Sequence, residues 1–487
     1  MAVNLTTPAA EVDLLSDAYK PLMERLQANV LKSHGRDESR HVFLKFTGPA
    51  AAVRTWLREK IAPRVLSARL QHEQARDKVD GGLVMLFYLS AEGYRYLGFD
   101  PDKLKSKVFR KGMKNQDSSF FKDLFDTENR DPKVATWEPG FRESVHAMVA
   151  LSDDQKQDQT RLLNEVSLLK TQIAGIAQVL QVDEGRALRR IARNGTALAS
   201  PEPIEHFGYF DGISQPLFGK DDIQKYYDEG KGTKGAEHWD PGASLDLVLE
   251  KDPFVPDPDA FGSYFVYRKL YQNVGEFHAR EAECGAATGL GEELAGAMAV
   301  GRFEDGTPVV DTNVAGQKYD NDFMFESQDP EGFRCPAHSH IRKVNPRGTT
   351  PSTNLEKERR HRIVRRGIPY GKPMPDLCGP DEPSDPNPAA DRGLLFMCFQ
   401  ANIEKQFEFI QRTWVDNPNF PDSVLRPFED KTGDDPLIGQ ARNKKQRWPK
   451  TYGEESAGRT KFNFEAAVTL KGGEYFFAPS KPFLASL

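Results

Sequence analysis

The residues best suited to chemistry lie between Arg334 and Arg347, in the stretch R-C-P-A-H-S-H-I-R-K-V-N-P-R. Two of the ten histidines of the chain, His338 and His340, stand here among four arginine and lysine residues. A separation of two residues places both side chains on one face of an extended strand but on different faces of a helix. A neutral imidazole can ligate a metal ion while nearby cations neutralise an anionic cofactor, a combination that suits haem with its propionates. The alternative is a basic loop in which the histidines are incidental.

Length and composition indicate an ordinary globular protein of more than one domain. A chain of 487 residues is longer than one hydrophobic core usually organises, so two or three domains are expected. Hydrophobic residues make up 38% and charged residues 28%, with 39 glycines and 33 prolines, which is typical of a folded protein with many loops. The net charge of -6 gives no general reason to bind nucleic acid or an anionic membrane surface.

The sequence carries no targeting or membrane signal that we recognise. The stretch from Met1 to Pro8 lacks the basic and apolar regions of a secretory signal, and no run approaches a membrane span, so a cytoplasmic location is predicted. Four cysteines, spread from Cys284 to Cys398, are too few for a disulfide framework and are expected to be reduced thiols. The absence of C-x-x-C-H predicts that any haem would be held without thioether bonds.

The first third of the chain alternates between strand and helix signals. Strands are predicted at residues 40–48, 83–90 and 145–152, with a helix at 51–60 and another that Ser90 would cap. Residues 153–180 carry apolar side chains at helical spacing, which predicts one long amphipathic helix. A last strand at 204–210 would complete the element order of a ferredoxin-like unit. The predicted fold class is therefore α+β with antiparallel sheets.

A second alternation of elements follows a loop-rich segment. Residues 220–259 read as a linker or surface excursion, because they are rich in charged residues, glycine and proline. Beyond it we expect strands at 262–270, 393–400 and 465–470, with helices at 273–282 and 401–414. Residues 471–474 are predicted to turn the chain into a further strand at 475–478. The repetition is one of element order, without a fixed sequence period.

Two further motifs each allow a functional and an ordinary interpretation. In G-Y-F-D-G-I-S-Q-P, Gly208 and Gly212 could free the backbone to aim Asp211 into a cavity, although the motif could also be a plain Asp-Gly turn. Residues 359–366 contain five arginines, which could form a solvated helix face or an anion site. Gly367 and Pro369 argue against a continuous helix there. Residues 376–391 are expected to be a surface insertion.

Taken together, the motifs resemble those of the dye-decolourising peroxidases. The matching stretches, in the order of that family, are G-Y-F-D-G-I-S-Q-P, G-S-Y-F-V-Y-R-K-L, N-D-F-M-F, H-I-R-K-V-N-P-R, I-V-R-R-G-I-P-Y-G and G-L-L-F-M-C-F-Q. The resemblance spans roughly residues 208–440, and the segments 220–259 and 376–391 are similar to insertions of the longer members. It implies two ferredoxin-like domains, at 1–219 and 261–487, with residues 220–260 as linker or insertion. It also implies haem b bound chiefly by the second domain.

The resemblance assigns the residues around the iron. His340, directly before I-R-K, matches the proximal ligand, whereas His338 has no counterpart role. Ser339 stands where the family usually has alanine. Asp211 matches the distal acid-base residue, and Arg365 matches its distal partner.

Further residues are implied for the cofactor and its surroundings. Arg347 matches a contact to a haem propionate, and Leu394 and Phe396 match apolar residues over the distal face. A carboxylate is expected to hold the proximal imidazole N–H, and Asp434 or Asp435 is the candidate.

Two aromatic residues match positions at which the family has redox-active side chains. Tyr370 and Trp414 are therefore candidates for a relay that carries oxidising equivalents to the surface, where large substrates could be oxidised. The alternative is that both are packing residues with one satisfied polar edge.

The predicted reaction follows from these residue types. Hydrogen peroxide must lose a proton from its inner oxygen and gain one on its outer oxygen before the O–O bond breaks. Ionised Asp211 can carry both protons, and Arg365 stays cationic and can stabilise negative charge on the departing oxygen. An organic reductant such as a dye or a phenol would then restore the enzyme by one-electron steps.

Two other functions compete with this prediction. Cys335, His338 and His340 could serve a zinc hydrolase, although no second ligand pair is recognised. A haem protein for storage or iron handling would share every binding argument, but it would not turn over peroxide.

Overall fold

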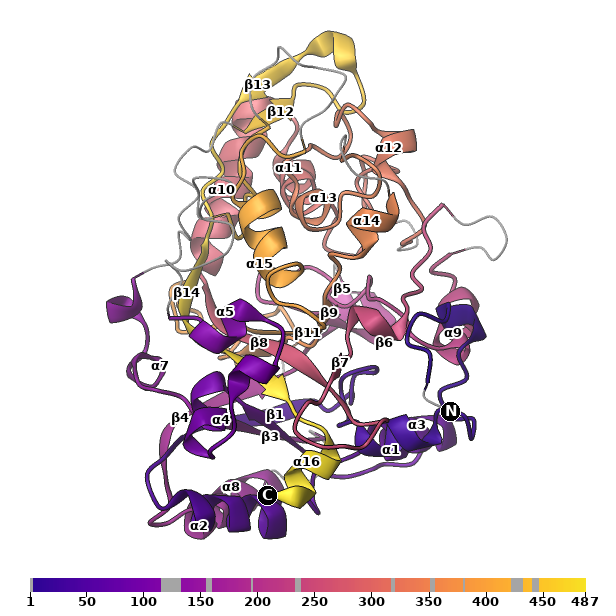
Figure 1. Cartoon of the computed structure of the whole chain (residues 1–487). Helices are drawn as coiled ribbons and strands as arrows, with labels where there is room; N and C mark the ends of the chain where they lie inside the picture. The colour runs from indigo at the N-terminus through magenta and orange to yellow at the C-terminus, as the bar shows by residue number, and fades with distance from the viewer. Residues whose placement is uncertain are drawn as a thin grey trace.

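The structure is a computed structural model of the whole chain, shown in Figure 1. It describes residues 3–114, 133–154, 160–193, 196–232, 238–316, 320–350, 355–379, 382–421, 432–439 and 446–487. The N-terminal residues build the lower half in Figure 1, and helices from the C-terminal residues form the upper half. Strands from both parts lie between these helical layers.

The N-terminal half is a ferredoxin-like unit. Its elements follow the chain order β1 (Glu38–Phe46), α2 (Ala50–Trp56), β2 (Val84–Leu89), β3 (Ala147–Asp153), α8 (Thr160–Gln172) and β4 (Ala177–Arg186). The strands lie in the order β4-β1-β3-β2 and all neighbours are antiparallel. Both faces of this sheet are covered, which explains why β2 reads as a continuous apolar run instead of an alternating pattern.

The C-terminal half repeats the same arrangement. Its strands are β8 (Phe261–Gln272), β10 (Ile368–Tyr370), β11 (Gly393–Gln400) and β14 (Val468–Ala478). Their order, β10-β11-β8-β14, is that of the N-terminal unit read from the other edge. Helices α10 (Val274–Thr288) and α11 (Glu292–Val300) follow β8 and lie in the upper layer. The predicted α+β fold of two ferredoxin-like units is thereby confirmed.

The two sheets share one core. They are hydrogen-bonded to each other where Phe477 of β14 pairs with Leu89 of β2. Their inner faces pack through aromatic side chains, including Phe43 against Tyr267, with ring centroids 4.8 Å apart. The opposite face of the C-terminal sheet is therefore left for the upper helices, and this face carries the candidate site.

Several shorter elements complete the described chain. The helices are α1 (Lys20–Arg25), α3 (Ala68–Asp77), α4 (Ala91–Tyr96), α5 (Lys107–Lys111), α7 (Pro139–Arg142), α9 (Lys220–Asp228), α12 (Phe325–Gln328), α13 (His340–Val344), α14 (Leu355–Arg359), α15 (Phe407–Phe409) and α16 (Lys481–Ser486). The strands are β5 (Leu188–Arg193), β6 (Thr196–Ile204), β7 (Glu250–Lys251), β9 (Val364–Arg365), β12 (Arg447–Pro449) and β13 (Arg459–Lys461). Ser90 caps α4 as predicted, because its hydroxyl accepts the Gly93 N–H at 3.0 Å. None of the helices in the described ranges combines the length and apolar character that a bilayer crossing requires.

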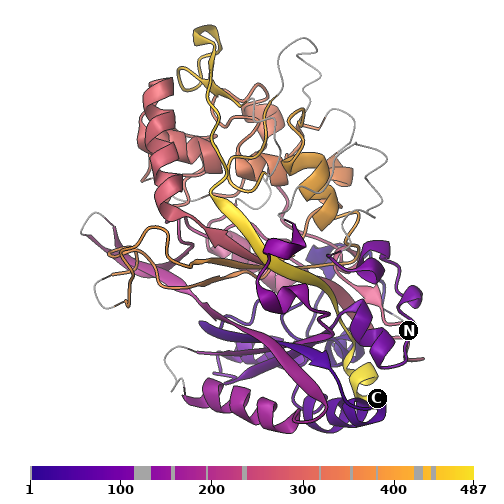
Figure 2. The same ribbon diagram turned by 90° about the vertical axis from the view of Figure 1, so that its left-hand side faces the viewer.

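The long helix predicted at 153–180 is shorter in the structure. Helix α8 ends at Gln172, and Gly175 follows with φ +80°, the left-handed conformation that ends helices. The chain then continues as strand β4, which supplies the last strand of the unit. The strand predicted at 204–210 is accordingly wrong: β6 ends at Ile204 and pairs with β5 in a separate two-stranded arm. Figure 2 shows this arm projecting from the side of the molecule.

Two predictions near the C-terminus are also corrected. The turn predicted at 471–474 is a bulge within the single strand β14, where the register shifts between Leu470 and Gly472. The helix predicted at 401–414 is reduced to α15 and a π-helical segment, Ile410–Val415.

The bulge generates a prediction about stability. Gly472 has φ +149°, and a Cβ added there would lie 2.3 Å from Cδ2 of Phe141. Gly472→Ala should therefore lower the free energy of unfolding by about 2 kcal/mol through overpacking, measured by denaturant titration. Gly367→Ala is the control, since its nearest contact would be 3.4 Å. Equal unfolding free energies for both variants would contradict the account of the bulge.

Candidate active site

His340 begins helix α13 and is held by a buried carboxylate. Its Nδ1 lies 2.8 Å from Oδ2 of Asp435, a hydrogen bond in which the imidazole N–H donates to the carboxylate. The other carboxylate oxygen accepts the backbone N–H groups of Leu437 at 2.8 Å and Ile438 at 3.0 Å. Of the two aspartates named by the sequence, the structure brings Asp435 to His340. The imidazole side chain is 24% exposed, and its Nε2 has no hydrogen-bond partner among the described residues.

The start of α13 is fixed by its neighbours in the upper layer. The hydroxyl of Ser339 donates to the carbonyl of Met298 in α11. Gly301, at the end of α11, lies so close that a Cβ there would be 2.2 Å from Cγ1 of Ile341. Serine in place of alanine before the histidine is therefore accommodated by a hydrogen bond to the adjacent helix.

His338 has a different environment from His340. Its ring is buried and meets the ring of Trp448 edge-on, with centroids 4.5 Å apart. Burial lowers the pKa of His338 to about 3, helped by Lys343 and Arg459, so the ring is neutral. Burial also raises the pKa of the Cys335 thiol to about 12. Within the described ranges no three His, Cys, Asp or Glu side chains gather as metal donors, so the zinc alternative has no ligand set there.

Asp211 and Arg365 are brought together from distant parts of the sequence. Arg365 ends β9, which pairs with β11, and Asp211 follows the two-stranded arm. Nη1 of Arg365 lies 3.6 Å from Oδ1 of Asp211, and the two side chains are 39% and 37% exposed. Oδ1 also accepts the Gly212 N–H at 2.6 Å, while Nη2 of Arg365 donates to the Ser214 carbonyl at 3.0 Å. Backbone groups of the residues that follow Asp211 thus orient both side chains.

Leu394 and Phe396 lie on one face of β11. They pair with Leu270 and Arg268 of β8, so these four side chains share the face of the sheet that meets the upper helices. Both are only partly buried although β11 is an interior strand, whereas Leu395, on the other face, is fully buried. This face therefore offers an incompletely covered apolar surface.

Arg347 is a buried cation with neutral partners. Its Nη1 donates to the carbonyls of Asn321 and Phe323, both at 2.8 Å, and Nη2 donates to Oδ1 of Asn321 at 2.5 Å. The guanidinium lies over the rings of Phe323 and Trp239, 4.0 and 4.5 Å from their centroids. Burial lowers the pKa of Arg347 to about 9, and no carboxylate of the described chain forms an ion pair with it. Because an uncompensated buried charge is costly, this position suits an anionic ligand.

The proposed relay residues are not at the surface. Tyr370 is 5% and Trp414 is 4% exposed. The Tyr370 hydroxyl donates to Asp391 at 3.3 Å, and Trp414 stacks on Phe420 with centroids 5.2 Å apart. Both rings are therefore part of the protein interior. Electron transfer through them stays a prediction, with each residue as an interior step.

Glu205 organises the loop that presents Asp211 and was missed by sequence reasoning. Its carboxylate accepts the N–H groups of Phe207 at 2.9 Å and Tyr209 at 3.0 Å, and the amide of Gln272. Burial raises the pKa of Glu205 to about 7. No sequence signal marks it, because its partners are backbone groups and a glutamine in β8.

Known proteins resemble this chain over its whole length. The family model described as Dyp-type peroxidase, C-terminal, matches residues 255–434. The multifunctional dye peroxidase DyP2 of Amycolatopsis sp. is 39% identical over 497 residues, covering 100% of both chains. The dye-decolorizing peroxidase msp1 of Mycetinis scorodonius is 34% identical over 80% of this chain and 74% of its own.

Solved structures agree with these sequence relationships. The DyP-type peroxidase of Anabaena sp. superposes with a TM-score of 0.83 at 39% identity, covering 96% of this chain and 95% of its own. The structure of DyP2 gives a TM-score of 0.84 at 36% identity over 100% of both chains. Fold and similarity together define the class, a haem peroxidase built from two ferredoxin-like units. The chain belongs to the DyP-type, or dye-decolourising, peroxidase family.

The raised pKa of Glu205 generates a prediction about pH and stability. The folded protein holds this proton up to about pH 7, whereas an unfolded glutamate releases it near 4.5. The free energy of unfolding should therefore fall by up to about 3 kcal/mol between those pH values on account of Glu205. Glu205→Gln should remove this part of the pH dependence, measured by urea titration at several pH values. The exposed Glu24→Gln is the control, and an unchanged pH dependence in the Glu205 variant would contradict the assignment.

Proposed function

We propose that this protein binds haem b through His340 and uses hydrogen peroxide to oxidise organic reductants such as dyes or phenols by one-electron steps. The observation that carries the proposal is the hydrogen bond from His340 Nδ1 to buried Asp435, which leaves Nε2 as the atom able to ligate iron. The choice of dyes rests on the relatives, two of which are named as dye peroxidases.

The residues present fit a haem group in three respects. His340 offers one nitrogen without a protein partner among the described residues. Leu394 and Phe396 offer an apolar surface for a flat ring, and Arg347 offers a buried cation for a propionate. When bound, the haem iron supplies the redox chemistry by which peroxide is activated.

Asp211 and Arg365 are assigned to proton transfer and charge stabilisation. Oδ1 of Asp211 is occupied by the Gly212 N–H and faces Arg365, so Oδ2 is the oxygen available to take a proton from peroxide and return it. Arg365 remains cationic and can stabilise negative charge on the oxygen that leaves. Haem storage, the alternative function, requires neither of these residues.

The first prediction from this proposal concerns haem binding. His340→Ala should purify largely without haem, because His340 stands at the ligand position of the family's motif and its Nε2 has no hydrogen-bond partner among the described residues. His338→Ala is the matched control and should retain haem, since its ring packs against Trp448. The ratio of Soret to protein absorbance measures both. Equal haem content in wild type and His340→Ala would exclude His340 as the ligand.

The second prediction concerns peroxide cleavage. Asp211→Asn should slow the reaction with peroxide by about 10²- to 10⁴-fold, the usual contribution of a general acid-base group, while leaving haem content unchanged. The wild-type enzyme should work in acid, because a carboxylate remains ionised at pH values where a histidine base is protonated. Stopped-flow mixing with peroxide across pH, for Asp211→Asn and Arg365→Leu, measures the weight of each residue. An acid limb titrating near neutrality would argue against a carboxylate base.

The third prediction concerns the interior relay. Trp414→Phe and Tyr370→Phe should each reduce turnover of a bulky dye while preserving turnover of a small phenol, at an equal rate of reaction with peroxide. The reason is that a dye too large to approach the haem depends on electron transfer through the protein. Steady-state assays with both substrates test it, and normal dye turnover in the double variant would eliminate both residues.

A further inference from the structure

Helix α13 is too short to hold its own position. It contains five residues, little more than one turn, and such a helix is unstable without external contacts. Three of its side chains reach three different loops. His340 contacts Asp435, Lys343 donates to the carbonyls of Asn417 at 2.7 Å and of Phe420, and Arg342 reaches the loop that precedes the helix. The orientation of His340 therefore depends on these ties.

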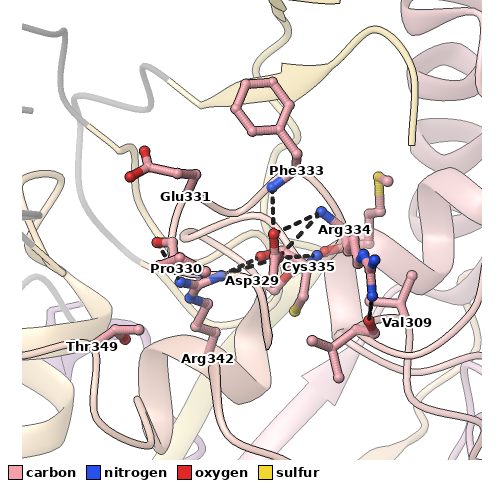
Figure 3. Close-up of polar contacts among 12 residues, drawn as sticks. Val309, Asp329, Pro330, Glu331, Phe333, Arg334, Cys335, Arg342 and Thr349 are labelled. Carbon is pink, nitrogen blue, oxygen red and sulfur yellow. Dashed lines mark hydrogen bonds and ion pairs between the residues drawn. The ribbon is translucent and has the colours of Figure 1, made fainter. Parts of the chain in front are cut away.

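Among these three side chains, Arg342 makes the most hydrogen bonds, which Figure 3 shows. The guanidinium is buried and donates to the Cys335 carbonyl at 2.7 Å, the Pro330 carbonyl at 3.0 Å and the Asp329 carboxylate at 3.3 Å. It also lies over the ring of Phe325, 4.8 Å from the centroid. One side chain thus holds both ends of the loop from 330 to 335 against α13.

Asp329 holds the same loop from within. Its carboxylate accepts the N–H groups of Phe333 at 2.9 Å, Arg334 at 3.2 Å and Cys335 at 2.8 Å, in addition to the contact with Arg342. Both oxygens are used, so the carboxylate is satisfied although it is buried. Asp329 and Arg342, which we call the loop clamp, form one buried unit.

The position of Arg342 on α13 allows the loop clamp to influence the orientation of the His340 ring. Successive residues of a helix are rotated by about 100°, so Arg342 projects about 200° from His340, on the far side of the helix. The hydrogen bonds of Arg342 on that side resist rotation of the helix about its axis. Such a rotation would move the imidazole relative to Asp435, which is only 2.8 Å away and fixed by its own backbone contacts. Apolar residues of similar volume can often replace a buried ion pair without loss of stability, so stability alone does not account for this one.

We propose that Asp329 and Arg342 are positioning residues for His340, and that the loop clamp sets the strength of the hydrogen bond between His340 and Asp435. The proposal rests on the proposed function in one respect, namely that His340 is the iron ligand. Neither residue touches the reacting atoms, so their effect must be read through His340.

The test is resonance Raman spectroscopy of the reduced holoenzyme, in which the iron–imidazole stretching band reports the hydrogen bond of the ligand. Arg342→Met and Asp329→Asn should shift or split this band, and haem should transfer to an acceptor protein about tenfold faster than from wild type. Arg334→Met is the matched control. It removes an exposed arginine of the same loop whose one guanidinium hydrogen bond to the described part of the chain goes to the Val309 carbonyl at 3.4 Å, away from α13. Its band and haem transfer rate should equal those of wild type.

Two further variants keep the outcome decisive. Should Arg342→Met fail to fold, Arg342→Lys keeps the charge but reaches fewer of the three acceptors, so its band should still differ from wild type. A wild-type band that survives in His340→Ala would overturn the assignment of the ligand, and the loop clamp proposal with it. A band that depends on His340 but is unchanged in Arg342→Lys and Asp329→Asn would overturn the loop clamp alone.

Discussion

The candidate site depends on the hydrogen bond between His340 and Asp435. A fully buried carboxylate would be costly without donors, and Asp435 has them: two backbone N–H groups on one oxygen and the imidazole on the other. The backbone contacts come from Leu437 and Ile438, two and three residues after Asp435, so the turn aims the second oxygen at His340. The imidazole is thereby held in the tautomer whose Nε2 carries a lone pair.

Buried charge is distributed unevenly around this pair. Next to it, Lys343 is buried near Asp416, Asp434 and Asp435, and burial lowers its pKa to about 7 despite these carboxylates. Around Arg347 the hydrogen-bond acceptors are neutral, and Arg302 is the charged group that lowers the pKa of Arg347 most after burial. The surroundings of Lys343 are thus rich in carboxylates, whereas arginine is the main charged neighbour of Arg347.

Local signals in the sequence predicted the elements that carry the site, but not the contacts that orient them. Strand β11 has the predicted bounds because Gly393 and Gln400 flank the apolar run L-L-F-M-C-F. Ser90 caps its helix because capping involves only neighbouring residues. Local patterns could not choose between Asp434 and Asp435, since either of two adjacent carboxylates can face a given partner. Glu205 and the loop clamp were missed for a related reason. Their partners are mostly backbone groups, which leave no mark in the amino-acid sequence.

The end of β14 and helix α16 have a consequence for how the chain folds during synthesis. Helix α16 packs on the N-terminal unit, where Phe483 contacts the rings of Tyr94 and Phe99 and Lys481 donates to the carbonyl of Val65. These partners emerge from the ribosome several hundred residues before α16 does. The N-terminal unit therefore exposes part of its aromatic core until residues 481–486 have been made, and it cannot reach its final packing as an independent first domain. The last strand of the second unit, β14, and the helix that completes the first unit, α16, are therefore synthesised together, near the end of translation.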